Sequence, residues 1–117
     1  MVLDSLELAR HIVDVIADKK GEDVLLLDIR DVSILADYFV IGNATSERQA
    51  KATVEGLKQE MKKTFDVVPL HIEGESSTGW VLMDYGSIVV HLFAPEARAY
   101  YDLERLWQNG RVVVRML

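Results

Sequence analysis

The sequence predicts a single α/β domain whose mixed sheet of about five strands is flanked by helices. Two segments have the apolar spacing of amphipathic helices: residues 5–19, and a stretch that begins after Ser46 and continues through Phe65. Short apolar runs between turn residues alternate with these helices, as expected for strands buried in a sheet. The 117 residues suit one hydrophobic core and contain no linker or repeat, so residues 1–117 are expected to form one domain.

Each predicted helix has a recognisable start. Asp4 with Glu7, and Ser46 with Gln49, have the three-residue spacing of a capping box. A third helix is predicted over residues 95–109, because proline suits a first helical turn and glycine follows the end. The helices are therefore expected near the beginning, the middle and the end of the domain.

The predicted strands occupy the remaining apolar runs. Residues 24–29 and 38–41 are expected to be strands buried on both faces, and residues 68–72 a third, short strand. Residues 80–93 are typical of two strands joined by a tight turn. Residues 112–114 fit either a last edge strand or a tail that becomes ordered on a partner.

The hairpin at residues 80–93 carries the candidate functional surface. Side chains alternate along a strand, so Trp80, Leu82 and Asp84 share one face, while Val89 and His91 share a face of the next strand. A patch that mixes apolar, aromatic, acidic and histidine side chains is typical of protein interfaces. Tryptophan at a strand start is also common in cores, and Asp84 could bond the turn instead of a partner, so both interpretations remain open.

Bulk composition narrows the class of partner. The formal net charge is −6, which disfavours DNA and RNA as primary partners and suits a basic protein, although the same charge would serve solubility alone. The chain lacks cysteine, so disulfides and thiolate chemistry are excluded. No apolar run approaches the roughly 20 residues of a membrane span, and no basic secretion signal opens the chain. These features favour the cytoplasm and no membrane contact.

The sequence offers no catalytic, cofactor-binding or metal-binding motif. The three histidines, His11, His71 and His91, lack metal-ligand spacing, and neither a nucleophile elbow nor a phosphate-binding glycine motif occurs. Two-metal phosphoryl transfer needs paired acidic groups, but Asp28 is followed two residues later by Arg30. We therefore expect a protein that binds and is not an enzyme.

Several motifs resemble, in order and over nearly the whole chain, the ribosomal silencing factor family, also called Iojap-like. They are Asp37-Tyr38-Phe39-Val40-Ile41, Gln49, Glu73-Gly74, Gly79-Trp80-Val81-Leu82-Met83-Asp84-Tyr85-Gly86, Val89-Val90-His91-Leu92-Phe93, Arg98, Tyr100-Tyr101, Leu103-Glu104 and Leu106-Trp107. The resemblance implies a nucleotidyltransferase-like fold without the catalytic motif.

The resemblance also implies a function. It indicates a translation repressor that binds the fourteenth protein of the large ribosomal subunit, with little or no direct RNA contact, and sterically blocks the small subunit from joining. It further implies a homodimer, which an uncovered edge strand would allow. The partner-binding residues that we place on the hairpin by this resemblance are Trp80, Leu82, Asp84, Tyr85, Val89 and His91.

Two alternatives belong to other functional classes. A divergent nucleotidyltransferase would bind nucleotides with Mg²⁺ despite its altered motif. A homodimeric adaptor would act in large-subunit assembly without silencing translation. The segment 111–117 has no role that the family pattern settles.

Overall fold

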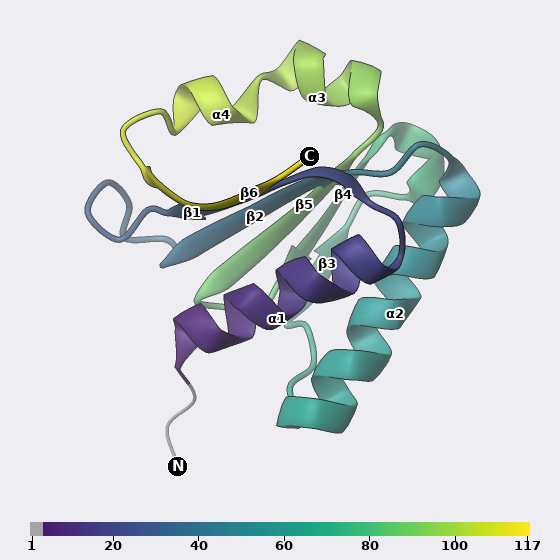
Figure 1. Cartoon of the computed structure of the whole chain (residues 1–117), viewed down its shortest axis with the longest axis horizontal. Coiled ribbons are helices and arrows are strands. Elements are labelled where there is room, and N and C mark those ends of the chain that lie inside the picture. The colour runs from purple at the N-terminus through teal and green to yellow at the C-terminus, as the bar shows by residue number, and fades with distance from the viewer. Residues whose placement is uncertain (1–3) are drawn as a thin grey trace.

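The computed structural model describes residues 4–117, apart from the side chain of Ser76. Its helices and strands form three layers, with the sheet in the middle (Figure 1). The elements are, in order, α1 (Ser5–Asp18), β1 (Glu22–Asp28), β2 (Tyr38–Asn43), α2 (Glu47–Phe65), β3 (His71–Glu73), the 3-10 helix η1 (Ser76–Thr78), β4 (Trp80–Asp84), β5 (Ile88–Phe93), α3 (Pro95–Tyr101), α4 (Leu103–Leu106) and β6 (Arg111–Met116).

The sheet has six strands in the order β3-β4-β5-β2-β1-β6. β2 and β5 run parallel, and the other neighbouring strands are antiparallel, so the prediction of a mixed α/β sheet is confirmed. The sixth strand is β6, which pairs with β1 and forms one edge. The segment that fitted either an edge strand or a tail is therefore an edge strand.

The two faces of the sheet are covered by different helices. We call the face that packs against α1 and α2 the lower face, and the face that packs against α3 and α4 the upper face (Figure 1). The lower face is built from aliphatic strand residues such as Leu26, Val40 and Met83, which are fully buried. The upper face brings aromatic residues, among them Phe39 and Phe93, against Leu103 of α4.

The two long helices begin where the sequence predicts. Asp4 accepts a hydrogen bond from the Leu6 amide, and Ser46 accepts one from the Gln49 amide at 3.1 Å. The second half of the predicted capping box differs, because the Gln49 side chain accepts from the Thr45 amide at 2.6 Å and not from Ser46. The cap is thus shared over two residues, and α2 is held at the point where it leaves β2.

The predicted single helix over residues 95–109 is wrong. Asp102 has a φ of 47°, a left-handed conformation that aspartate tolerates better than most residues, and it separates α3 from α4. The Asp102 amide still donates to the Arg98 carbonyl at 2.9 Å, which closes α3. The break directs the Leu103 side chain into the core on the upper face, where it is 8% exposed.

The third strand is shorter and later than predicted. Residues 68–72 were expected to form it, but β3 covers only His71–Glu73. Pro69 has no amide hydrogen to donate, which disfavours ladder pairing at that position. Leu70 donates to the Asp84 carbonyl at 2.8 Å and leads the chain into β3.

Candidate partner-binding surface

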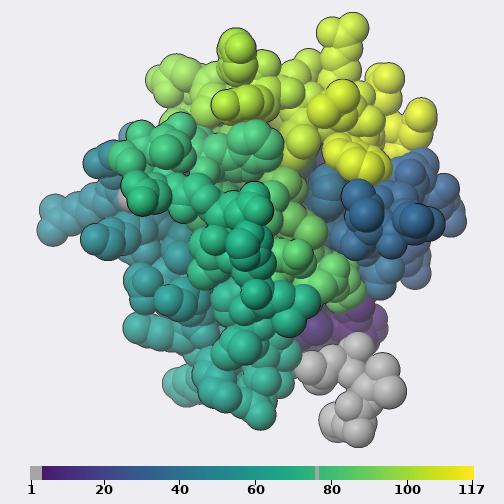
Figure 2. Space-filling model, turned by 180° about the vertical axis from the view of Figure 1, so that it is seen from behind, coloured from purple at the N-terminus to yellow at the C-terminus, as the bar shows by residue number. Residues whose placement is uncertain are grey.

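The β4–β5 hairpin brings four of the predicted site residues together. Trp80 lies opposite Phe93, Leu82 opposite His91, and Asp84 opposite Val89, all on the upper face. Trp80, Leu82, Asp84 and Val89 are each half-buried, and we call these four residues the hairpin patch. α3 and α4 cover β1, β2 and part of β5, and green atoms of the β4–β5 region stay at the surface beside them (Figure 2).

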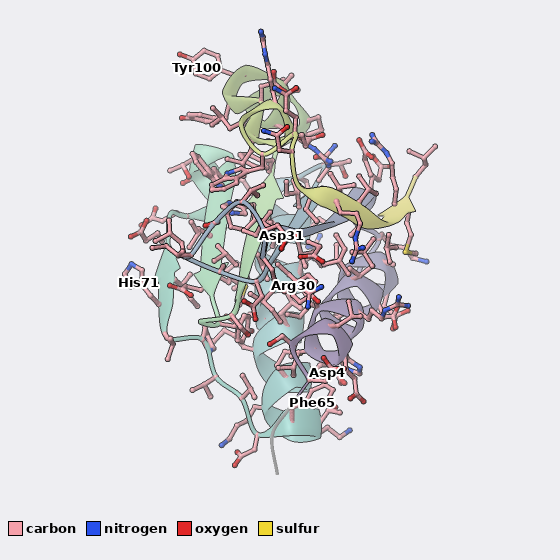
Figure 3. All side chains as sticks on the ribbon, turned by 90° about the vertical axis from the view of Figure 1, so that its left-hand side faces the viewer. Asp4, Arg30, Asp31, Phe65, His71 and Tyr100 are labelled. Atoms are coloured by element: carbon pink, nitrogen blue, oxygen red, sulfur yellow. The ribbon has the colours of Figure 1, made fainter. Side chains whose placement is uncertain are left out.

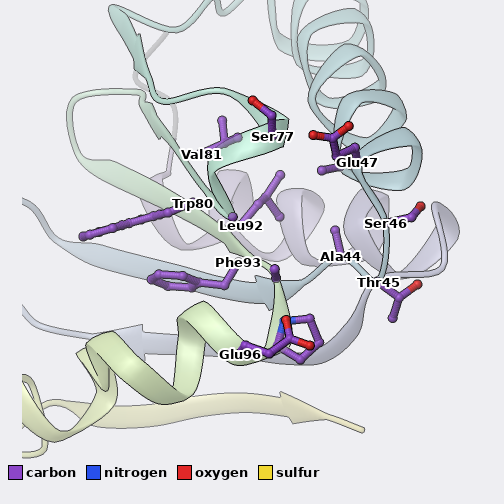
Figure 4. Close-up of a pocket in the computed structure, with 14 residues that line it drawn as sticks. Ala44, Thr45, Ser46, Glu47, Ser77, Trp80, Val81, Leu92, Phe93 and Glu96 are labelled. Atoms are coloured by element: carbon purple, nitrogen blue, oxygen red, sulfur yellow. The ribbon is translucent and has the colours of Figure 1, made fainter.

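Trp80 belongs both to the core and to the surface. Its ring lies 5.0 Å from that of Phe93 and 4.6 Å from that of Tyr101, measured between centroids. Its indole N–H donates to Nδ1 of His91 at 3.2 Å. Figure 4 shows Trp80 extending along the sheet next to Phe93. The side chain is therefore held from several directions while part of it stays open to a partner.

His91 lies beneath the patch and not in it. It is only 3% exposed, and Phe39 meets its ring edge-on at 4.8 Å between centroids. Burial lowers the pKa of His91 from 6.5 to about 4, so the imidazole is neutral at physiological pH. His91 therefore presents almost no surface to a partner, and it contacts Trp80 from beneath.

Tyr85 also lies apart from the patch. Its ring packs against the lower-face core, and burial raises the pKa of its hydroxyl to about 12. It sits at the hairpin turn, where its amide donates to the Ile88 carbonyl at 2.8 Å. Asp84 accepts from the Gly86 amide at 2.7 Å, so it bonds the turn while part of the half-buried side chain stays at the surface.

Exposed aromatic and aliphatic groups extend the patch toward α3 and α4. Tyr101 is 46% exposed beside Trp80, and Tyr100, which meets Tyr101 edge-on, is 82% exposed. Leu106 is 74% exposed on α4. Figure 3 shows Tyr100 pointing away from the body of the protein at the upper end. The sequence did not place either tyrosine ring next to Trp80.

A polar rim borders the patch on β3. His71 lies opposite Asp84 and Glu73 opposite Leu82, and the two β3 side chains contact each other at 2.8 Å. Both are exposed at the sheet edge, where His71 points outward (Figure 3). The predicted strand at residues 68–72 included His71 but ended one residue too early to include Glu73, so the pairing of these two side chains was missed.

Arg98 fastens the α3–α4 segment to the sheet. It is 6% exposed and donates from Nη1 to the Asp23 carbonyl and to Oδ1 of Asn43, the latter at 2.9 Å. Its Nε donates to Glu104 at 3.1 Å. One buried guanidinium thus ties α3 to α4, to β1 and to the end of β2. The helical spacing of residues 95–109 did not distinguish this arginine from a solvent-exposed one.

A cavity of about 220 Å³ opens at the carboxyl ends of β2 and β5, where α2 and α3 leave toward opposite faces. Such crevices commonly hold ligands in α/β sheets. Glu47 and Glu96 flank this one (Figure 4), and two carboxylates would repel a nucleotide phosphate. Among residues 4–117, no group of three or more acidic, histidine or cysteine side chains could hold a metal ion.

No helix in the described part of the chain is long and apolar enough to cross a membrane.

The comparisons with known proteins agree with one another. A family model described as "Ribosomal silencing factor during starvation" matches residues 2–116. The ribosomal silencing factor of Halalkalibacterium halodurans is 36% identical over 111 residues, which cover 95% of this chain and 94% of the relative. A mouse protein named mitochondrial assembly of ribosomal large subunit protein 1 is 35% identical over 98 residues, or 82% of this chain and 43% of the mouse protein.

The fold has a solved counterpart. A crystal structure of a Chromobacterium violaceum protein superposes with a TM-score of 0.85 at 31% identity and covers 96% of this chain and 94% of its own. Sequence and structure therefore point the same way over nearly the full length of the domain. The chain belongs to the ribosomal silencing factor family.

Proposed function

We propose that this protein silences ribosomes by binding the fourteenth protein of the large subunit through the hairpin patch, which blocks the small subunit from joining. Membership of the ribosomal silencing factor family supports the general role. The observation that carries the proposed site is Trp80, a large aromatic side chain that is fixed by its neighbours and only half-buried. Fixed tryptophans at the centre of a surface are frequent hot spots of binding energy.

The proposed mechanism is occlusion without a chemical step. Trp80, Leu82 and Val89 would lose water on contact and supply the affinity. Asp84 is only half-buried, and the chain carries a net charge of −6, so a basic ribosomal protein would be attracted and oriented by charge. A domain bound at the face where the subunits meet would then prevent translation sterically, in the cytoplasm.

The exposure of the side chains supports a narrower set of proposed contact residues. Trp80, Leu82, Asp84 and Val89 present atoms at the surface, and Tyr101 adds a partly exposed ring beside them. His91 and Tyr85 act from inside, because one lies under Trp80 and the other packs on the lower face.

A second role, in large-subunit assembly, is favoured by the mouse relative's name. The same patch would serve both roles, since each requires a contact with the large subunit. Self-association would compete for the contact if a second copy covered the patch. The two roles differ in timing: an assembly factor would be found on immature particles, and a silencing factor on mature large subunits.

The decisive experiment is co-sedimentation of the purified protein with isolated large subunits at two salt concentrations. Trp80→Ala is expected to weaken binding by about 2 kcal/mol or more, which is a loss of about thirtyfold. Trp107→Ala is the matched control, because Trp107 is the other tryptophan of the chain and packs against Phe39 on the same sheet face outside the patch. Circular dichroism must show that both variants are folded.

The outcomes separate the parts of the proposal. Loss of binding in Trp80→Ala with binding retained in Trp107→Ala supports the patch. Equal binding of Trp80→Ala and the wild type would place the contact elsewhere on the domain. If the wild type does not co-sediment at either salt concentration, the proposed function itself fails. A subunit-joining assay with added small subunits then tests whether bound protein blocks association.

A further inference from the structure

His91 is an unusual residue for its surroundings. It is 3% exposed, and its neighbours on the upper face are the rings of Phe39, Trp80 and Phe93. Its Nε2 is buried and has no hydrogen-bond partner among the described residues. Buried polar atoms without partners are rare in native proteins and lower stability. A phenylalanine would fill this space without that disadvantage, so packing alone does not explain a histidine here.

The other imidazole nitrogen, Nδ1, is hydrogen-bonded. Nδ1 of His91 accepts the hydrogen bond from Nε1 of Trp80 at 3.2 Å. Because Trp80 lies opposite Phe93 and His91 lies opposite Leu82, this bond crosses diagonally between β4 and β5. An imidazole can accept at Nδ1 only when that nitrogen carries no proton, so the neutral ring carries its proton on the orphaned Nε2. The unpartnered nitrogen is therefore the consequence of the bond to Trp80.

We propose that His91 is a positioning residue for partner binding: it turns the indole N–H of Trp80 inward and leaves only the apolar ring surface for the partner. This inference rests on the proposed function of the hairpin patch. Tyr101, at 4.6 Å between centroids, restrains the same ring from the α3 side. A ring that is already fixed loses less conformational freedom on binding, which strengthens the contact.

The inference also specifies the chemistry of the partner. Tryptophan at an interface commonly donates its indole N–H to the other protein. Here that donor is occupied within the domain, so the partner surface over Trp80 is expected to present aliphatic groups and no acceptor for the indole. Polar recognition would then come from the rim, where Asp84 and Glu73 are accessible.

Two substitutions at His91 separate positioning from packing. His91→Phe keeps a ring of similar size and removes the acceptor. His91→Asn keeps an acceptor at the place of Nδ1 and removes the ring. The chain has two tryptophans, so the nitrogen–proton NMR spectrum contains two indole signals, and Trp107 provides an internal reference. A Trp80→Phe sample identifies the Trp80 signal.

In His91→Phe, the Trp80 indole signal is expected to shift and its proton to exchange faster with solvent, while the Trp107 signal stays close to its place. The thermal midpoint should not fall, because the orphaned N–H is gone, yet affinity for isolated large subunits should fall about fivefold. In His91→Asn, the midpoint should fall, because a ring is lost from the core, while affinity measured below that midpoint stays nearer the wild type.

Other results would overturn the inference. An unchanged Trp80 signal in His91→Phe would mean that the hydrogen bond does not hold the indole. A shifted signal with unchanged affinity would mean that the partner does not need a fixed Trp80. A fall in affinity that matches a fall in the midpoint in both variants would show a purely structural role. If wild-type protein fails to bind large subunits, the proposed function and the partner role fall together, and the indole signals still decide whether His91 holds Trp80.

Discussion

The lower and upper faces of the sheet are made from the same strands, but they differ in composition and in how completely helices cover them. The lower face is aliphatic and is covered by α1 and α2, which have 14 and 19 residues. The upper face is rich in aromatic rings and is covered by α3 and α4, which have only 7 and 4 residues. The short helices leave the hairpin patch uncovered. One face is thus covered by long helices, and the other leaves part of its apolar surface open, as the proposed binding role requires.

Strand β4 contributes to both faces through alternate residues. Met83 points to the lower face and is 0% exposed, whereas its neighbour Leu82 points to the upper face and is half-buried. Two adjacent aliphatic residues of similar size thus have different surroundings. They allow the contrast between the faces to be tested within a single strand.

The largest effect is expected from Met83→Ala, compared with Leu82→Ala. Removing the fully buried Met83 side chain should lower the free energy of unfolding by about 3 kcal/mol, because a cavity remains in the lower core. Leu82→Ala should cost less, about 1 kcal/mol, since that side chain is only half-buried and leaves no enclosed cavity. Urea denaturation of the two variants and the wild type measures both values.

Binding should show the opposite order. Leu82→Ala is expected to weaken co-sedimentation with large subunits, whereas folded Met83→Ala should bind like the wild type. Equal losses of stability in the two variants would contradict the assignment of separate roles to the two faces.

A smaller loss of stability is expected when α3 and α4 are held less firmly to the upper face. Arg98→Met keeps a long side chain but leaves Asp23, Asn43 and Glu104 without their shared donor. The partners Asp23 and Glu104 are about one-third exposed, at 33% and 31%, so water recovers part of the loss. We expect the free energy of unfolding to fall by about 2 kcal/mol. Urea denaturation measures the fall, and hydrogen exchange should show faster exchange concentrated in α3 and α4. Arg105→Met, on the exposed side of α4, is the control and should change neither.

A pH dependence that arises on the upper face is also expected, and it develops only gradually as the pH falls below the physiological range. The pKa of His91 is about 4 in the folded protein against 6.5 for the free group, so the unfolded chain binds more protons between these values. Stability from the neutral imidazole is therefore fully present above pH 6.5 and decreases as the pH falls toward 4, by about 1.4 kcal/mol for each pH unit. Urea denaturation at several pH values should show this slope, and His91→Phe should remove it. An identical slope in the two proteins would assign the titration to other groups.

The local parts of this fold were predictable from the sequence. α1 was expected over residues 5–19 and spans Ser5–Asp18, because a sustained apolar spacing and a capping residue act within a few residues of each other. The hairpin was predictable for the same reason, since Gly86, with a φ of 89°, supplies the turn and the alternation fixes which side chains share a face. Trp80, Leu82, Asp84 and Val89 were therefore placed together correctly.

The features that were missed depend on distant contacts. Strand alternation predicted the sheet face on which His91 lies but not how deeply its side chain is buried. The burial comes from Trp80 and Phe39, which belong to other strands. The break at Asp102 accompanies the burial of Arg98 and Leu103 on the sheet. The spacing of apolar residues in the sequence does not reveal that burial. The sixth strand needed β1 as a partner from the other end of the chain.

The pairing of β6 with β1 also affects how the chain folds. β1 has the continuous apolar run Val24-Leu25-Leu26-Leu27, and β2, its partner on one side, follows closely along the chain. The other edge of β1 remains unpaired until β6 forms. The two strands are far apart in the sequence, and contacts over such a long loop form slowly. When β6 docks, Arg111 pairs with Asp28 at 3.1 Å and Arg115 with Asp23 at 3.3 Å. The apolar β1 is thereby enclosed between two strands, and the sheet ends in a strand that carries two arginines.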